Sequence, residues 1–151
     1  VGNFTQLVVA GQGLVGDEPP AEGGDGLGPN PYEFLLAALG TCKAITLLMY
    51  ARRKGWPLEG VEVTLDQERV HSADCQTCES AGAYIHRIHS RVQLRGPLEE
   101  GMRARLAEIA GRCPMHRTLT SPVEIVEEVA LTAGGSDEGS AAVPAALGDT
   151  H

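Results

Sequence analysis

The sequence predicts one folded domain that combines helices with antiparallel strands. Three features indicate this: a long apolar helix over residues 30–54, alternating strands over residues 61–71 and 84–95, and an amphipathic helix over residues 97–113. A chain of 151 residues can build one domain with its own core and is short for two. Its 42% hydrophobic and 21% charged residues are ordinary for a globular protein.

Charge and hydropathy narrow the class of partners. The net charge is −8 and no run of Lys and Arg occurs, so nucleic acid and anionic membrane surfaces are poor partners. No uninterrupted apolar stretch reaches 18 residues, and the first forty residues contain no Lys or Arg, unlike a signal peptide. We therefore expect a cytoplasmic protein. In that reducing compartment its four cysteines suit reactive thiols or a metal site better than a disulfide framework.

The N-terminal third contains two short strands and the start of the long helix. Residues 3–10 and a segment ending at Val15 read as strands, and residues 16–29 as a loop rich in Gly and Pro. Asn30 is a good N-cap, and a proline follows at the first helical position. The helix should end near Lys54, where Gly and then Pro follow.

This helix is apolar on most of its sides. Its large apolar side chains are Phe34, Leu35, Leu36, Leu39, Ile45, Leu47, Leu48 and Met49. Such a helix is expected to be buried all round rather than laid on a surface. Because one small chain can hardly enclose it, the pattern favours a dimer.

The next two segments read as the strands of an antiparallel pair. On the first strand, residues 61, 63 and 65 are apolar and the alternate positions are mostly acidic; on the second, residues 84, 88, 92 and 94 are apolar and the alternate positions mostly basic. Acidic and basic outer faces suit pairing of the two strands. The loop between them, residues 72–83, is long for a hairpin.

The C-terminal part contains the second helix and a final strand. Leu98, Met102, Leu106, Ile109 and Cys113 form an amphipathic stripe that ends at Pro114. Val123–Leu131 reads as a strand, and residues 133–151 as a flexible tail of Gly, Ala, Ser and acidic residues.

Cys42 and Cys113 lie on the inward faces of the two helices. Each can be a small buried hydrophobe, as free cysteines often are. If the two faces meet, however, two thiols converge in an apolar pocket, as a peroxidatic and resolving pair requires. His116 and Arg117 follow Cys113 closely, and a positive charge there favours the nucleophilic thiolate. Alternatively, both side chains face solvent.

A second cysteine motif lies in the long loop. Cys75 and Cys78 have the CxxC spacing, and His71 lies four residues ahead. Zinc would accept this set, with Asp74, Glu79 or His86 as the fourth ligand. A redox dithiol and a purely structural pair are the other readings. A zinc-binding or redox-sensing protein thus remains one alternative function.

Several motifs resemble one known family. Residues 28–42 (GPNPYEFLLAALGTC), 49–51 (MYA), 54–58 (KGWPL) and 113–119 (CPMHRTL) resemble the OsmC / organic hydroperoxide resistance family. Residues 17–19 (DEP) and 71–79 (HSADCQTCE) resemble the branch also found fused to α/β-hydrolase domains. The resemblance covers about residues 3–132.

The resemblance implies an α+β fold in which antiparallel sheets pack on a long buried central helix. It implies one domain over residues 1–132, and an intertwined homodimer with active sites at the interface. In such a protein Cys42 is the peroxidatic thiol. Its sulfenic acid condenses with Cys113, and a dithiol reductant restores both thiols without any cofactor. The apolar helix faces around Cys42 favour organic hydroperoxides as substrates.

The chain departs from the family pattern at two charged positions. Family peroxidases pair an N-terminal Arg with a Glu directly after the helix-opening Pro, but here that position is Tyr32 and the first Arg is Arg52. Lys43, Arg52 and Arg117 are the candidate positive charges. The missing Arg favours another alternative, a small-ligand-binding or accessory module without peroxidase turnover.

Glu33 is the nearest carboxylate to the family position. It lies nine residues before Cys42, about 13 Å along a straight helix and on its opposite side. A catalytic Glu33 should therefore serve the Cys42 of a partner chain. The simpler reading is a first-turn Glu that stabilises the helix dipole.

Overall fold

The computed structural model describes residues 6–10, 12–71 and 84–129. The chain divides into two compact units. One contains the residues up to Pro29 together with those from Glu124 onward, and the other is Asn30–Val123.

The first unit contains the two expected N-terminal strands. β1 (Gln6–Ala10) and β2 (Gln12–Gly16) pair antiparallel. A short 3-10 helix, η1 (Pro20–Glu22), follows in the Gly- and Pro-rich loop. The Asp17 carboxylate, only 2% exposed, organises this loop by accepting the backbone N–H groups of Glu18, Asp25 and Leu27.

The expected C-terminal strand does not form. Residues 122–129 have neither helical nor strand structure, so the prediction of a strand over Val123–Leu131 is wrong as far as residue 129. Val123, Ile125, Val126 and Val129 are all exposed. A strand needs a neighbour for its backbone groups, and no strand among the described residues pairs with this segment. Residues 130–151, which include the expected tail, lie outside the described part.

In the second unit, α1 (Pro31–Lys54) has the predicted ends. The Asn30 side chain accepts the N–H of Glu33, and the Glu33 carboxylate accepts the N–H of Asn30, which closes a capping box. At the other end, Gly55 takes the left-handed conformation with φ of 65°. The sequence thus positions this helix by its caps.

Only one stripe of α1 is buried within the chain. Leu39, Lys43, Leu47 and Ala51, spaced four residues apart, are buried together with Gly40, whereas Ile45 and Met49 are 51% and 66% exposed. The expectation that α1 is buried all round therefore fails for a single chain, because one chain has too few elements to cover the other faces. With a mean hydropathy of 1.7, α1 is long and apolar enough to cross a membrane, but the core helices of globular proteins meet the same two criteria. Here it packs against β3, α2 and α3.

β3 (Gly60–His71) and β4 (Tyr84–Arg95) form the predicted antiparallel pair. The register places Val61 opposite Leu94 and Val63 opposite Val92 on one face, where Leu65 packs close to Gly40 of α1.

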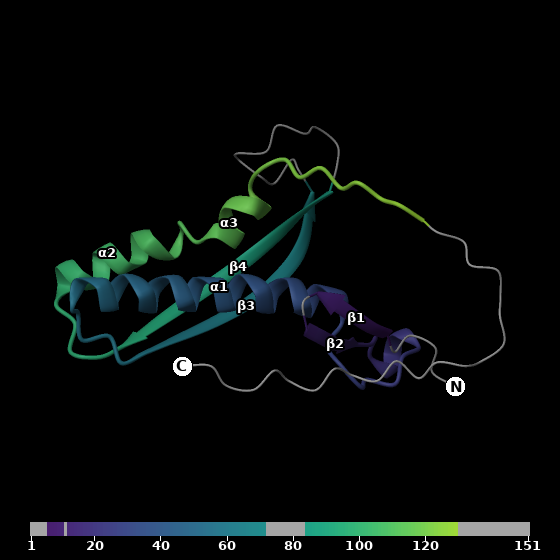
Figure 1. Ribbon diagram of the computed structural model, residues 1–151, viewed down its shortest axis with the longest axis horizontal. Helices are drawn as coiled ribbons and strands as arrows, with labels where there is room; N and C mark the ends of the chain where they lie inside the picture. The colour runs from purple at the N-terminus through teal and green to yellow at the C-terminus, as the bar shows by residue number, and fades with distance from the viewer. Residues whose placement is uncertain (1–5, 11, 72–83, 130–151) are drawn as a thin grey trace. The chain divides into compact units, whose positions relative to one another are not determined.

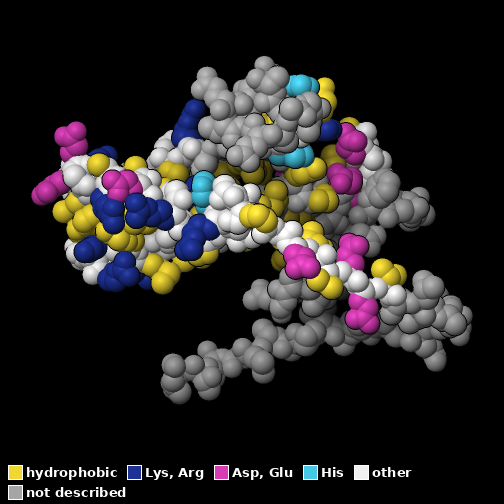
Figure 2. Space-filling model, turned by 90° about the horizontal axis from the view of Figure 1, so that it is seen from above, with side chains coloured by type: hydrophobic (Ala, Val, Ile, Leu, Met, Phe, Trp, Pro, Cys, Tyr) yellow, Lys and Arg dark blue, Asp and Glu magenta, His cyan; other side chains and the backbone are white. Residues whose placement is uncertain are grey.

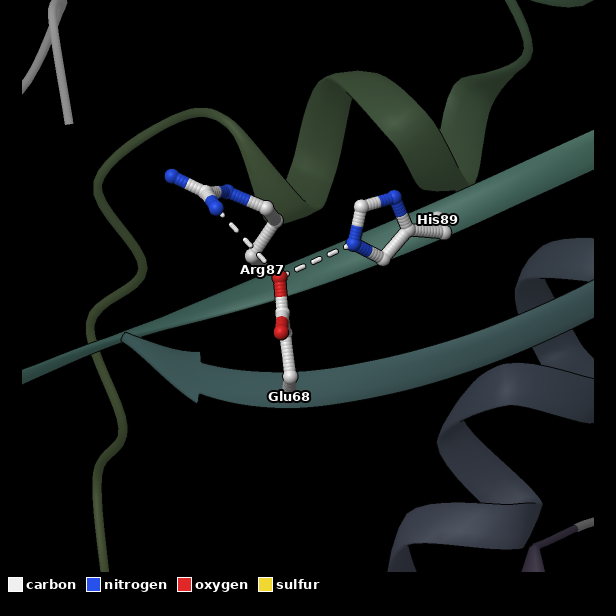
Figure 3. Close-up of polar contacts among 3 residues, drawn as sticks. All are labelled: Glu68, Arg87 and His89. Carbon is white, nitrogen blue, oxygen red and sulfur yellow. Dashed lines mark hydrogen bonds and ion pairs between the residues drawn. The ribbon is translucent and has the colours of Figure 1, made fainter. Parts of the chain in front are cut away.

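The other face of this pair carries complementary charges. Glu62 bonds Arg95, and Glu68 accepts from both Arg87 and His89 of β4, as Figure 3 shows. His89, then Arg87, lowers the pKa of Glu68. The cross-strand charge pattern predicted from the sequence is confirmed.

The last two helices run along α1 (Figure 1). α2 (Glu100–Ala110) begins later than expected, and Pro114 opens a further helix, α3 (Pro114–Leu119), rather than only ending the preceding one. Proline suits this first helical position because the N–H that it lacks would have no partner there. Basic side chains gather at the α2 end of the unit (Figure 2).

The core lies between α1, α2 and the apolar face of the strand pair. Its buried members are Leu47, Ala51, Leu98, Leu106, Ile109 and Ala110. The stripe predicted for the second helix is therefore the face that packs on α1. This packing places Cys113, at the end of the stripe, beside α1.

Replacing Gly96 by Ala should destabilise the protein. Gly96 has φ of 133°, and a Cβ there would lie 2.1 Å from the Pro57 carbonyl oxygen, so backbone must move. We expect a loss of about 2 kcal/mol in the free energy of unfolding, measured by urea denaturation. Gly101→Ala is the control, because nothing lies within 4 Å of its Cβ and helix propensity should add roughly 0.5 kcal/mol. Equal stability of the two variants would contradict this account of the turn.

Candidate active site

Two cysteines from different elements lie at the contact between α1 and α3. Cys42 is in the middle of α1, and Cys113 lies in the link between α2 and α3, where it is the N-cap of α3. Cys113 is fully buried and Cys42 is partly exposed, and both are free thiols. The two inward helix faces meet as the sequence predicted.

The first turn of α3 binds both sulfur atoms. The backbone N–H of Met115 donates to Cys42 Sγ at 3.5 Å, and the next N–H, that of His116, donates to Cys113 Sγ at 3.3 Å. Consecutive peptide groups thus hold the two sulfurs close to one another. An N–H donor favours the thiolate over the thiol, since it stabilises negative charge.

The groups around Cys113 have opposing effects on the pKa of its thiol. Burial raises the pKa of the Cys113 thiol, the His116 N–H lowers it, the neighbouring Cys42 side chain raises it, and the charge of Lys43 lowers it. The net direction is upward, so Cys113 rests as a protonated thiol at neutral pH. The two thiols are neighbours, since consecutive amides of α3 bind them.

Of the three candidate cations, Lys43 alone is buried. Its side chain is 5% exposed and its Nζ donates to the Ala110 carbonyl oxygen at 2.9 Å. Arg52 and Arg117 are both exposed. No described hydrogen bond or ion pair joins the Arg117 guanidinium to either cysteine.

Arg117 lines a shallow hollow beside α3. The hollow has a volume of about 400 Å³ and is lined by Pro114, Arg117, Thr118, Ser121, Pro122 and Val123. Neither cysteine is among these side chains. The structure thus places Arg117 on the same short helix as the thiol-binding amides but on its solvent side.

Glu33 takes part in the capping box and is exposed. This geometry favours the simpler reading of Glu33 as a helix-start residue, and a catalytic role stays a prediction that needs a second chain. Tyr32, at the family Glu position, stacks on His86 with ring centroids 5.6 Å apart. His86, one of the candidate fourth zinc ligands, is exposed.

The possible metal site falls largely outside the described residues. Cys75 and Cys78 belong to residues 72–83, which lie outside the described part. His71 is described, and its ring packs edge-on against that of Tyr84 with the two centroids 5.5 Å apart. Among the residues that the structure describes, no group of three or more His, Cys, Asp and Glu could hold a metal ion.

Sequence reasoning missed the two amides and named His116 only for its imidazole. A signal for the His116 amide was present, because Pro114 suits the first helical position and so makes Cys113 the N-cap. In that arrangement the third helical N–H, here that of His116, is free to bind the N-cap side chain.

The geometry defines an α+β protein with a pair of neighbouring free thiols, one buried and one partly exposed. The family model for OsmC-like proteins matches residues 23–128, so this chain belongs to the OsmC-like family. The matched span includes Cys42 and Cys113 and confirms the family resemblance of the motifs.

Solved structures share the fold at low sequence identity. An OsmC-like protein from Mycoplasma pneumoniae has a TM-score of 0.60 at 21% identity, over 76% of this chain and 78% of its own. An osmotic stress induced and detoxification response protein from Psychrobacter arcticus 273-4 has a TM-score of 0.55 at 15% identity, over 77% and 87%. An organic hydroperoxide resistance protein from Legionella pneumophila has a TM-score of 0.52 at 18% identity, over 78% of this chain and 88% of its own. No curated protein matches the chain.

The two thiols should differ in their reaction with iodoacetamide. At neutral pH Cys42 should be labelled first, because it is partly exposed, whereas Cys113 is fully buried and its pKa is raised. Labelling of Cys113 should accelerate as the pH rises past the ordinary thiol value of about 8.5, since the thiolate is the nucleophile. Peptide mass spectrometry measures both rates, and the urea-unfolded protein is the control in which they converge. Faster labelling of Cys113 at neutral pH would contradict this geometry.

Proposed function

We propose that this protein is a thiol-dependent reductase of organic hydroperoxides, with Cys42 as the peroxidatic residue and Cys113 as the resolving residue. The observation that supports this most is the binding of both sulfurs by the consecutive N–H groups of Met115 and His116. Exposure supports this choice of roles: Cys42 is partly open to a substrate, and Cys113 is buried beside Cys42.

The proposed reaction has three steps. The Cys42 thiolate attacks the terminal oxygen of the hydroperoxide, the O–O bond breaks, and the alcohol leaves after taking a proton. Cys42 is then a sulfenic acid. The Cys113 thiolate attacks that sulfur, the S–O bond breaks, water leaves with a proton, and a disulfide forms. An external dithiol supplies two electrons and two protons to restore both thiols.

Family membership supports a redox role. Structural neighbours from Legionella pneumophila and Vibrio cholerae are organic hydroperoxide resistance proteins. At 18% identity each they share the fold, so the mechanism rests on the cysteines of this chain. A cytoplasmic location suits the scheme, because the compartment keeps dithiol reductants reduced.

We further propose that the functional form is an intertwined homodimer. Ile45 and Met49 of α1 are more than half exposed, and the segment 122–129 has no strand partner among the described residues. A second copy would bury the apolar side chains and pair the open backbone groups. It would also supply a Glu33 to the opposite Cys42, which one chain cannot do on geometric grounds.

Replacing either cysteine should stop the reaction at a different point. Cys42→Ser should abolish consumption of cumene hydroperoxide in the presence of a dithiol. Cys113→Ser should consume about one equivalent and accumulate Cys42 sulfenic acid, trapped by dimedone. In the unaltered protein, one equivalent of hydroperoxide should give a Cys42–Cys113 disulfide, identified in peptides by mass spectrometry.

The double variant Cys75→Ser, Cys78→Ser is the matched control and should retain turnover. Loss of turnover in this double variant, together with loss of bound zinc, would favour the metal or redox-sensing alternative. Undiminished turnover by Cys42→Ser would sink the assignment. Failure of both thiols of the folded protein to react with peroxide would instead favour a binding or accessory module.

Charging the open face of α1 should dissociate the dimer. Light scattering should give twice the chain mass of 15.9 kDa for the unaltered protein. Met49→Glu should give the mass of one chain, because a carboxylate would be buried in an apolar interface without a partner. Thr64→Glu, opposite Arg91 on the charged face of the strand pair, introduces the same charge and should remain dimeric. A monomeric unaltered protein would contradict the proposal.

A further inference from the structure

Lys43 is a buried charge that the proposed reaction does not use. Its side chain is 5% exposed, and its one described hydrogen bond is the donation from Nζ to the Ala110 carbonyl oxygen. An ammonium has three donors. Among residues 12–71 and 84–129, no carboxylate lies within ion-pair distance of it, since the ion pairs of this part involve other residues.

Capping of α2 explains part of this arrangement. The Ala110 carbonyl is at the C-terminal end of α2, where a cation is favourable. A neutral donor would satisfy that oxygen as well, without the cost of burying a charge. An ammonium without a counter-ion in a buried position is expensive, typically several kcal/mol. The bond to Ala110 therefore does not explain why the residue is charged.

The position of Lys43 supplies the missing reason. It directly follows Cys42 in α1, and its anchor, Ala110, lies three residues before the fully buried Cys113. The groups of α1 that act on the Cys113 thiol are Cys42 and Lys43, and α3 contributes the His116 amide. Arg112 and Arg117, the cations that flank Cys113 in the sequence, are exposed.

We propose that Lys43 is the internal counter-charge of the Cys42–Cys113 pair and stabilises the Cys113 thiolate that attacks the Cys42 sulfenic acid. This deepens the proposed function and rests on it. Lys43 acts by its charge alone: the Cys113 proton passes to solvent, the S–S bond forms, and the departing oxygen takes a proton to leave as water. Lys43 touches no substrate and acts through the thiolate alone.

The test is an equilibrium titration that needs no peroxide. In a background with Cys42, Cys75 and Cys78 replaced by Ser, Cys113 is the single thiol, and the ultraviolet absorbance of its thiolate is followed against pH. Lys43→Gln keeps a donor for Ala110 but removes the charge, and it should move the midpoint upward by about one pH unit. Lys43→Arg keeps the charge and should restore most of the shift.

Lys54→Met is the control, because it removes the only other lysine, at the exposed end of the same helix, and should leave the midpoint unchanged. If Lys43→Gln does not fold, Lys43→Met serves, since replacing a buried ion by an apolar side chain is often tolerated. With Cys42 restored, the same change should slow disulfide formation from the sulfenic acid. We expect about threefold per unit of midpoint shift, because the weaker acid is also the better nucleophile.

A charge-free variant with an unchanged midpoint but lower stability would overturn the proposal and leave Lys43 as a cap of α2. A shifted midpoint in a protein that never reduces hydroperoxide would overturn the proposed function instead, while it supports the effect of Lys43 on the thiol.

Discussion

The site depends on two neighbouring peptide N–H groups at the start of α3. Pro114 has no N–H and fixes the backbone of the first helical position, so the next donors, Met115 and His116, are free. The His116 N–H donates to the sulfur of Cys113, the N-cap of the same helix. The Met115 N–H donates to the sulfur of Cys42, because α1 packs on α3. Rigid backbone therefore fixes where both sulfurs lie. A side chain with several rotamers would fix them less well.

The same packing creates an electrostatic conflict. Burial of Cys113 removes water and raises its pKa, which protects the thiol at rest but makes it a weak nucleophile at neutral pH. The amide of His116 and the buried charge of Lys43 act in the opposite direction. A resolving cysteine needs this intermediate state, since it must remain reduced until its partner is oxidised and then react at once.

The sequence predicts the elements with strong local signals. The caps of α1, the stripe of α2 and the charge pattern of the strand pair are all as expected. The caps are strong local motifs, and the other two patterns repeat over several turns or residue pairs. α3 was missed because its six residues are too few to show a period. The sequence names Lys43 as a candidate cation, and its burial could also have been predicted, because it lies four residues from both Leu39 and Leu47 on the buried stripe. The role of Met115 could not have been predicted from the sequence, because this residue acts through its backbone N–H.

Two of the failed expectations, the burial of α1 on all sides and the C-terminal strand, have one physical origin. Apolar faces of α1 and the backbone of residues 122–129 both lack a partner in the described chain. The apolar side chains of α1 are exposed to water, which costs free energy in proportion to their area. The backbone groups of residues 122–129 lack protein partners, and burying them without hydrogen bonds would be costly. A second copy would relieve both without any new element. It would also cover the partly exposed Cys42. The hollow described beside α3 is shallow and lined by neither cysteine, so it offers no enclosed site for an organic tail. Under the proposed function, selection among hydroperoxides would then depend on the partner chain, whereas both thiols of the pair come from one chain.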